Sequence, residues 1–147
     1  MGRVLIVGLG STIMSDDGLG VHALRQLADH ALPEHADTLE AGTALFDVLP
    51  DLRPYDKLIL IDAVDAEHDV VNVLRNPAGA GIWPDGLSSH ELGLEQALLA
   101  RRLTDGRLPE VVIIGVKPKK IELGEELSPE VAGKIPAVVQ AVLDEVR

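Results

Sequence analysis

Apolar residues follow two patterns along this chain, and together the patterns predict an α/β fold. Short continuous apolar runs predict strands that are buried on both faces, as in a parallel sheet, and apolar residues at helical spacing predict amphipathic helices between them. Strands are predicted at residues 3–7, 37–40, 57–61, 70–74 and 111–114, and helices at 17–30, 43–49, 90–103 and from 128 onward. We therefore expect three α/β/α layers around a five-stranded, mostly parallel, twisted sheet.

The fourth predicted strand, at residues 70–74, follows the third after a short polar gap. A gap of this length is too short for a crossover helix, so we expect the fourth strand to pair with the third as an antiparallel edge strand. Residues 76–88, rich in Pro and Gly, and the charged residues 117–127 are predicted loops. We expect the 147 residues, 1–147, to form a single domain.

Composition narrows the possible partners. The formal net charge of −11 and the single Trp, Tyr and Phe disfavour nucleic-acid binding, which needs basic and aromatic side chains. The absence of Cys excludes disulfides, thiolate zinc sites and a cysteine nucleophile. Neither a signal peptide nor a membrane-spanning segment is recognisable, so we expect a cytoplasmic protein with no membrane partner.

The segment after the first strand has unusual chemistry. Gly8 and Gly10 follow a buried strand, as in dinucleotide-binding turns, but Ile13 stands where the third glycine would be. The turn then continues into two adjacent carboxylates, Asp16 and Asp17, which would repel a phosphate and attract a cation. The sequence therefore favours the fold of a nucleotide-binding domain without its ligand.

Three acid or imidazole groups fall where parallel sheets bind ligands, at the carboxyl ends of strands. Asp17 follows the first strand, Asp62 ends the third, and His90 opens a helix after a long loop. These two carboxylates and one imidazole can converge on one divalent cation, such as Ni, Zn, Mn or Fe, and leave coordination positions open. A metal-assisted catalytic site is the resulting hypothesis.

Each candidate also has a purely structural interpretation. Asp17 can cap the first helix, Asp62 can form an Asx-turn, and His90 can simply be exposed. Gly42 and Thr43, after the second strand, either let a ligand approach the backbone closely or form an ordinary turn in which Thr43 caps the next helix.

Other charged residues are less specific. The basic cluster of Lys117, Lys119 and Lys120 is either a solvated loop or a contact for an acidic partner segment. The remaining histidines are interpreted as surface residues: His22, His30, His35 and His68.

Taken in order, the motifs resemble the hydrogenase maturation endopeptidases, which process the large subunit of nickel-iron hydrogenases. The resemblance covers nearly the whole chain and is carried by Gly8-Leu9-Gly10-Ser11, Asp16-Asp17-Gly18-Leu19-Gly20, Ala41-Gly42-Thr43, Asp62-Ala63, Ser88-Ser89-His90-Glu91-Leu92-Gly93-Leu94, Gly115-Val116-Lys117-Pro118 and Leu127-Ser128-Pro129-Glu130-Val131. Ser11 replaces the Asn that is usual in the family, and Ala41 replaces the first Gly of its G-G-T turn.

The resemblance implies a protease that removes a C-terminal extension from the hydrogenase large-subunit precursor after nickel insertion. It implies that Asp17, Asp62 and His90 recognise nickel that the substrate supplies, although zinc or cadmium can occupy the same groups. Gly42 and Thr43 would then contact the substrate.

If the resemblance holds, Asp17 or Asp62 would act as the catalytic base. Asp16 and Ser11 would contact the metal-binding residues and hold them in position. The alternative role of Asp16 is a helix cap. Two other functions stay open at this point: a chaperone that binds the precursor in a metal-dependent way without cutting it, and a nucleotide-binding domain.

Overall fold

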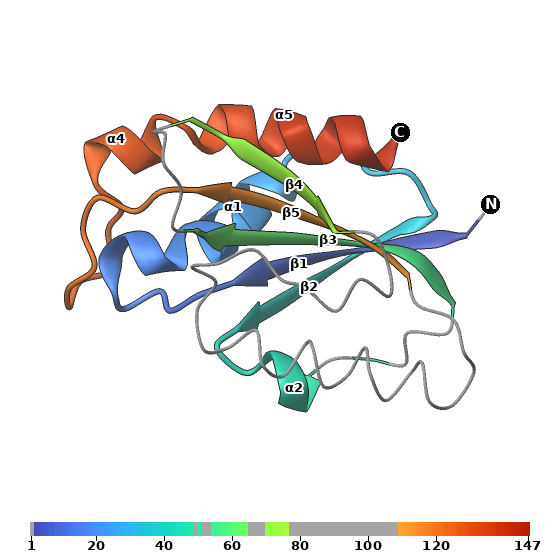
Figure 1. Ribbon diagram of the computed structural model, residues 1–147, viewed down its shortest axis with the longest axis horizontal. Helices are drawn as coiled ribbons and strands as arrows, with labels where there is room; N and C mark the ends of the chain where they lie inside the picture. The colour runs from blue at the N-terminus through green and yellow to red at the C-terminus, as the bar shows by residue number, and fades with distance from the viewer. Residues whose placement is uncertain (1, 49, 51–53, 65–69, 77–108) are drawn as a thin grey trace.

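The computed structural model describes residues 2–48, 50, 54–64, 70–76 and 109–147 (Figure 1). Within these residues the chain forms one five-stranded sheet with the order β2-β1-β3-β5-β4. The strands are β1 (Arg3–Leu9), β2 (Ala36–Gly42), β3 (Tyr55–Ala63), β4 (Asn72–Asn76) and β5 (Glu110–Val116). All neighbouring strands are parallel except β4, which pairs antiparallel with β5 at the edge. The predicted α/β class with an antiparallel edge strand is confirmed.

The central strands are apolar because both of their faces are covered. In β1, Val4 and Ile6 pack into a core on one face, and Leu5 and Val7 pack into a second core on the other. This alternation follows from the two-residue period of a strand. A strand buried in this way reads as a continuous apolar run, which is why the sequence locates β1, β3 and β5 well.

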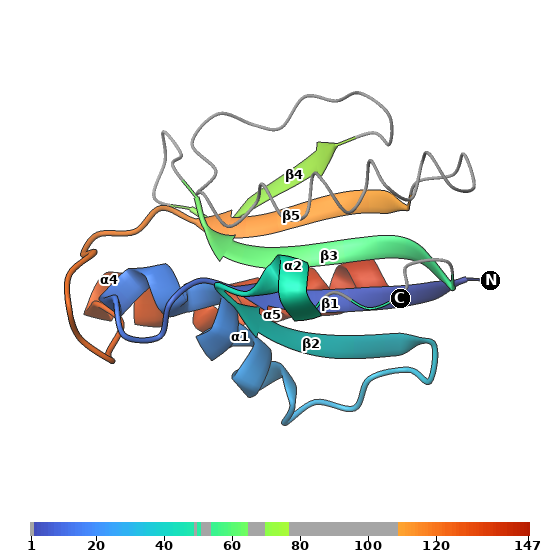
Figure 2. The same ribbon diagram turned by 90° about the horizontal axis from the view of Figure 1, so that it is seen from below.

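Helices lie on both faces of the sheet. The helical elements are a 3₁₀ turn η1 (Ser15–Gly18), α1 (Leu19–Leu27), α2 (Leu45–Val48), α4 (Pro129–Ala132) and α5 (Ile135–Val146). Figures 1 and 2 show α1, α4 and α5 on one side of the sheet and α2 on the other. The helix predicted at 90–103 lies outside the described residues. None of the helices within them is long and apolar enough to cross a membrane.

The partner of β4 was predicted incorrectly. We expected β4 to pair with β3, but β5 lies between them. The physical reason is that β5 is buried along its length after Glu110 and needs a hydrogen-bonded neighbour on each side. The polar β4, which contains Asn72 and Arg75, suits the exposed edge instead.

Two helices differ from their predicted bounds for identifiable reasons. The helix predicted from residue 128 is two helices, because Pro136 has no N–H to donate to a preceding turn and therefore sits at the start of α5. The helix predicted at 17–30 begins only at Leu19, because Asp17 belongs to η1.

Candidate active site

The candidate site lies where the sheet topology changes direction. From β1 the chain passes to β2 on one side, and from β3 it continues toward β5 on the other, so the adjacent strands β1 and β3 flank the switch point. Ligands of open α/β sheets bind at the carboxyl ends of strands at such a point. Asp17 follows β1 and Asp62 lies near the end of β3, so the topology places both beside it.

Two glycines allow the chain to pack closely at this point. Gly10 has a φ of 107°, which an ordinary residue avoids, and a Cβ there would collide with the carbonyl oxygen of Asp17. The same Cβ would lie 3.5 Å from Oδ1 of Asp62. Gly20 lies in the first turn of α1, and a Cβ there would collide with the carbonyl oxygens of Leu9 and Ile61. The turn at Gly10 therefore brings the Asp17 backbone and the Asp62 carboxylate to one place.

Asp17 does not cap the first helix. The N-cap position of α1 is Gly18, and no side chain makes a capping hydrogen bond there. Instead, Oδ2 of Asp17 accepts a hydrogen bond of 2.9 Å from the backbone N–H of Ser11. The Asp17 side chain is half-buried, so its carboxylate is held toward the Gly10 turn and stays within reach of solvent.

Asp62 is almost completely buried, with 1% of its surface exposed. Its Oδ1 accepts a hydrogen bond of 2.8 Å from the backbone N–H of Ala63, the last residue of β3. An Asx-turn, the structural alternative for Asp62, would instead involve the N–H group two positions further on. A carboxylate this deeply buried costs free energy unless hydrogen bonds or nearby charges compensate it.

Asp16 faces the opposite way and has a structural role. Its carboxylate accepts four hydrogen bonds of 2.7–2.8 Å, from the N–H groups of Lys119, Lys120 and Ser128 and from Oγ of Ser128. Burial alone would raise the pKa of Asp16, but these bonds outweigh it and hold the pKa below its usual value. We call Asp16 and these three partners the anchor. Asp16 therefore neither caps α1 nor is directed toward Asp17.

Of the other predicted site residues, some lie beside Asp17 or the Gly10 turn, and one is exposed. Ser11 supports Asp17 through its backbone, so the change from Asn leaves this bond possible. Gly42, with a φ of 59°, accepts a 2.9 Å hydrogen bond from the N–H of Gly10 and therefore adjoins the site. Thr43 is exposed, and α2 begins two residues after it.

The predicted three-group cation site is only partly described. His90 lies outside the described residues, and within those residues no three His, Asp or Glu side chains gather closely enough to hold a metal ion. Convergence of His90 with Asp17 and Asp62 stays a prediction.

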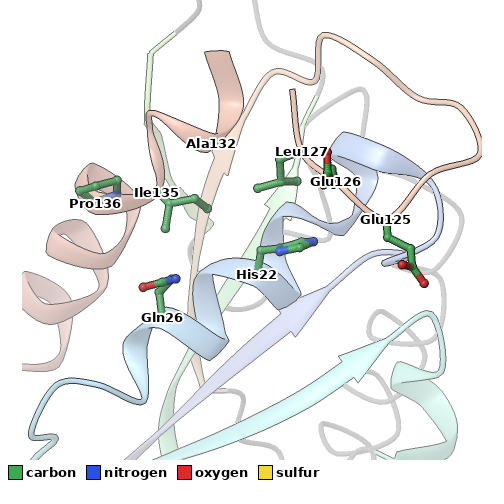
Figure 3. Close-up of a pocket in the computed structure, with 8 residues that line it drawn as sticks. All are labelled: His22, Gln26, Glu125, Glu126, Leu127, Ala132, Ile135 and Pro136. Carbon is green, nitrogen blue, oxygen red and sulfur yellow. The ribbon is translucent and has the colours of Figure 1, made fainter. Parts of the chain in front are cut away.

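A separate pocket of about 440 Å³ opens on the helical side of the molecule, between α1, the segment 125–127 and the α4–α5 region (Figure 3). Asp17 and Asp62 are not among the residues that line it. His22 lines this pocket, and its Nε2 atom is buried with no hydrogen-bond partner in the part of the chain that the structure describes. His22, predicted to be a surface residue, is therefore only partly exposed, with one ring nitrogen buried. Sequence reasoning also missed the anchor partners, because peptide N–H groups leave no signal in a sequence.

Comparison with known proteins agrees with this fold and identifies a family. A family model described as hydrogenase maturation protease matches residues 21–145. The chain is 29% identical to the hydrogenase 2 maturation protease of Escherichia coli, with 99% of this chain and 91% of that protein covered. It is 30% identical to the hydrogenase expression/formation protein HupD of Rhodobacter capsulatus, with 99% and 71% covered.

Solved structures give the same answer. The hydrogenase maturating endopeptidase HybD from E. coli superposes with a TM-score of 0.86 at 31% identity, with 99% of this chain and 92% of that chain covered. The [NiFe] hydrogenase maturation protease HybD from Thermococcus kodakarensis has a TM-score of 0.79 at 28% identity, and 99% of each chain is covered. The protein therefore belongs to the hydrogenase maturation protease family, a family of hydrolases.

Proposed function

We propose that this protein is a cytoplasmic endopeptidase that removes the C-terminal extension of a nickel-iron hydrogenase large-subunit precursor after nickel insertion. The observation that carries this proposal is the approach of Asp17 and Asp62 to the same turn, at the switch point of the sheet. The names of its relatives, which describe hydrogenase maturation and endopeptidase activity, support the same substrate class.

The nickel in this proposal is part of the substrate. Asp17, Asp62 and His90 would bind the nickel that the precursor carries, so that only a loaded precursor is held correctly for cutting. Two carboxylate oxygens and an imidazole nitrogen are a donor set that suits nickel, and zinc or cadmium would fit the same groups. The acidic character of the chain, with a formal net charge of −11, also favours a cationic feature on the partner.

The two carboxylates would have different roles because their burial differs. The half-buried Asp17 can reach a water molecule, and we assign it as the base that removes a proton from the water that attacks the scissile carbonyl. Asp62, with its Oδ1 held by the N–H of Ala63, would fix the position of the nickel. Substrate-borne nickel would contribute a Lewis acid that polarises the scissile carbonyl.

The turn itself supports a peptide substrate over a nucleotide. In a dinucleotide-binding turn, backbone N–H groups are directed at a phosphate. Here the N–H of Gly10 donates to Gly42 and the N–H of Ser11 donates to Asp17. Both donors are therefore already used within the protein.

The Asp62→Asn variant tests the proposal. The purified protein is mixed with a purified, nickel-loaded large-subunit precursor, and the mass of the product is measured over time. Asn keeps an acceptor for the Ala63 N–H but loses the charge that would bind nickel, so we expect the cleavage rate to fall by at least about 100-fold with the fold retained. Asp29→Asn, an exposed carboxylate beyond the end of α1, is the matched control and should cleave at the wild-type rate.

Three outcomes contradict parts of the proposal. Wild-type cleavage by Asp62→Asn removes Asp62 from the mechanism. Equal cutting of nickel-free and nickel-loaded precursor by the wild-type protein removes nickel recognition. Binding of the loaded precursor by the wild-type protein without any product makes the protein a chaperone instead.

A further inference from the structure

Exposed apolar side chains are concentrated beside the candidate active site. Six large apolar residues are exposed within the part of the chain that the structure describes: Ile13, Val48, Val70, Val73, Ile121 and Leu123. Ile13, Ile121 and Leu123 are 55%, 56% and 81% exposed, and all three lie in two segments that bond to each other. Single exposed apolar residues are ordinary, but several on one small unit mark an interaction surface. We call these three residues the apolar tip.

Backbone hydrogen bonds hold the two segments of the apolar tip together. The N–H of Gly124 donates to the carbonyl of Ile13 at 2.9 Å, and the N–H of Ser15 donates to the carbonyl of Gly124 at 2.8 Å. Oγ of Ser15 also donates to the carbonyl of Glu122 at 2.8 Å. Because the anchor fixes the same segments, the apolar tip is ordered before any partner arrives, which lowers the entropic cost of binding.

The apolar tip lies on segments that adjoin the candidate active site along the chain. Ile13 lies on the segment that connects the Gly10 turn to Asp17. Figures 1 and 2 show the segment 117–127, drawn in orange, extending beyond the ends of β1, β3 and β5. The apolar tip therefore lies at the same end of the sheet as Asp17 and Asp62, where a bound polypeptide can extend toward it.

We infer that the apolar tip docks an apolar surface of the folded part of the hydrogenase precursor, while the C-terminal extension enters the site. This inference rests on the proposed function. Exposed Lys120, Glu122 and Glu125 border the apolar residues, as a polar rim borders the core of a protein interface. The formal net charge of −11 disfavours the two other occupants, a second copy of this chain and an anionic membrane, because both would repel it.

The test is a triple variant, Ile13→Ser with Ile121→Ser and Leu123→Ser. Its matched control replaces the other three exposed apolar residues with serine: Val48, Val70 and Val73. Binding of the uncut, nickel-loaded precursor is measured by calorimetry, and KM and kcat are measured by mass spectrometry of the product. We expect Kd and KM to rise by at least about 10-fold in the apolar-tip variant, with kcat little changed, and to stay at wild-type values in the control.

The outcomes separate the docking inference from the proposed function. If the wild-type protein cuts the precursor and the apolar-tip variant has the wild-type Kd and KM, docking is overturned and the function stands. If the wild-type protein binds without cutting and the variant loses binding, docking stands and the function fails. If the wild-type protein neither binds nor cuts, both fail.

Two further measurements address the other occupants. Wild-type dimers in sedimentation that dissociate in the variant would reassign the apolar tip to self-association. Flotation of the wild-type protein with vesicles of phosphatidylcholine and phosphatidylglycerol, lost in the variant, would reassign it to a membrane. If the triple variant has a lowered Tm, Leu123→Ser alone, at the most exposed of the three positions, repeats the test and should give a smaller rise in Kd.

Discussion

Two neighbouring carboxylates, Asp16 and Asp17, lie in opposite environments. Asp16 is fully buried and accepts four hydrogen bonds from a segment more than 100 residues away in the sequence. Asp17 is half-buried, and among the described residues its side chain accepts one hydrogen bond, from Ser11, six residues away. One short turn therefore presents one carboxylate to the interior and the other to the candidate site.

This difference assigns a stabilising role to one carboxylate and a chemical role to its neighbour. A carboxylate whose acceptor sites are filled by donors is stabilised in its ionised form and has little capacity left for a substrate. A carboxylate with few partners is available for a cation or a water molecule. In this turn the hydrogen bonds of Asp16 hold the loop in place. Asp17 is therefore not needed to stabilise the fold, and its carboxylate can serve the candidate site.

The largest effect on stability should come from Asp16→Asn. The amide group would face donors where a second carboxylate oxygen now accepts, so at least one buried N–H would lose its partner. We expect the free energy of unfolding to fall by about 3 kcal/mol, measured by urea denaturation. Asp17→Asn, the matched substitution one position on, should cost at most about 1 kcal/mol, since its amide oxygen can still accept from Ser11. Equal losses of unfolding free energy in Asp16→Asn and Asp17→Asn would contradict the different roles assigned to the two carboxylates.

A smaller loss is expected for Ser128→Ala. The hydroxyl of Ser128 donates to Oδ2 of Asp16 and also accepts from the N–H of Val131 as the N-cap of α4. Its removal leaves the three backbone donors to Asp16 in place, so the unfolding free energy should fall by about 1.5 kcal/mol, with a matching decrease in Tm. Ser128→Thr keeps the hydroxyl and should lose much less. A loss in Ser128→Ala as large as that of Asp16→Asn would mean that the peptide donors contribute little.

The smallest effect is the pH dependence of the anchor. Because the pKa of Asp16 is lowered from its usual value of 3.8, the folded state keeps this carboxylate ionised at a pH where the unfolded chain binds a proton. The stabilisation is therefore complete above pH 3.8 and is lost as the pH falls through the lower folded pKa. The difference in unfolding free energy between the wild-type protein and Asp16→Asn should be constant from neutral pH down to about 3.8 and then narrow.

Urea denaturation across this pH range measures the difference, with Asp29→Asn as a control that should follow the wild-type curve throughout. A gap that widened in acid would show that protonation of Asp16 strengthens the anchor, contrary to this account.

Much of the fold could be predicted from the sequence because its strands are buried on both faces. The runs ending at Val7, Ile61 and Ile114 are apolar at nearly every position, and each contains or adjoins a strand core that the structure confirms. The partner of β4 could not be predicted, because edge pairing depends on which buried strand still lacks a neighbour. That information lies in β5, which comes later in the chain.

The location of Asp17 and Asp62 in the fold could be predicted, and the surroundings of individual candidate residues less so. The positions of Asp17 and Asp62 at strand ends follow from the apolar pattern and the parallel topology. Which of Asp16 and Asp17 faces the interior depends on donors at Lys119, Lys120 and Ser128, and no local pattern encodes that choice. The burial of the His22 Nε2 atom was missed for the same reason, since it depends on packing between distant segments.

The hydrogen bonds around these carboxylates come mostly from peptide N–H groups: Ser11 to Asp17, Ala63 to Asp62, and Lys119, Lys120 and Ser128 to Asp16. Every amino acid except proline carries such a donor, so the chain can vary its side chains at these positions over evolutionary time without losing the bonds. Tolerance of this kind does not extend to chain length. An insertion or deletion between Lys120 and Ser128 would shift the Ser128 donors relative to those of Lys119 and Lys120, which makes spacing a stricter inherited constraint here than residue identity.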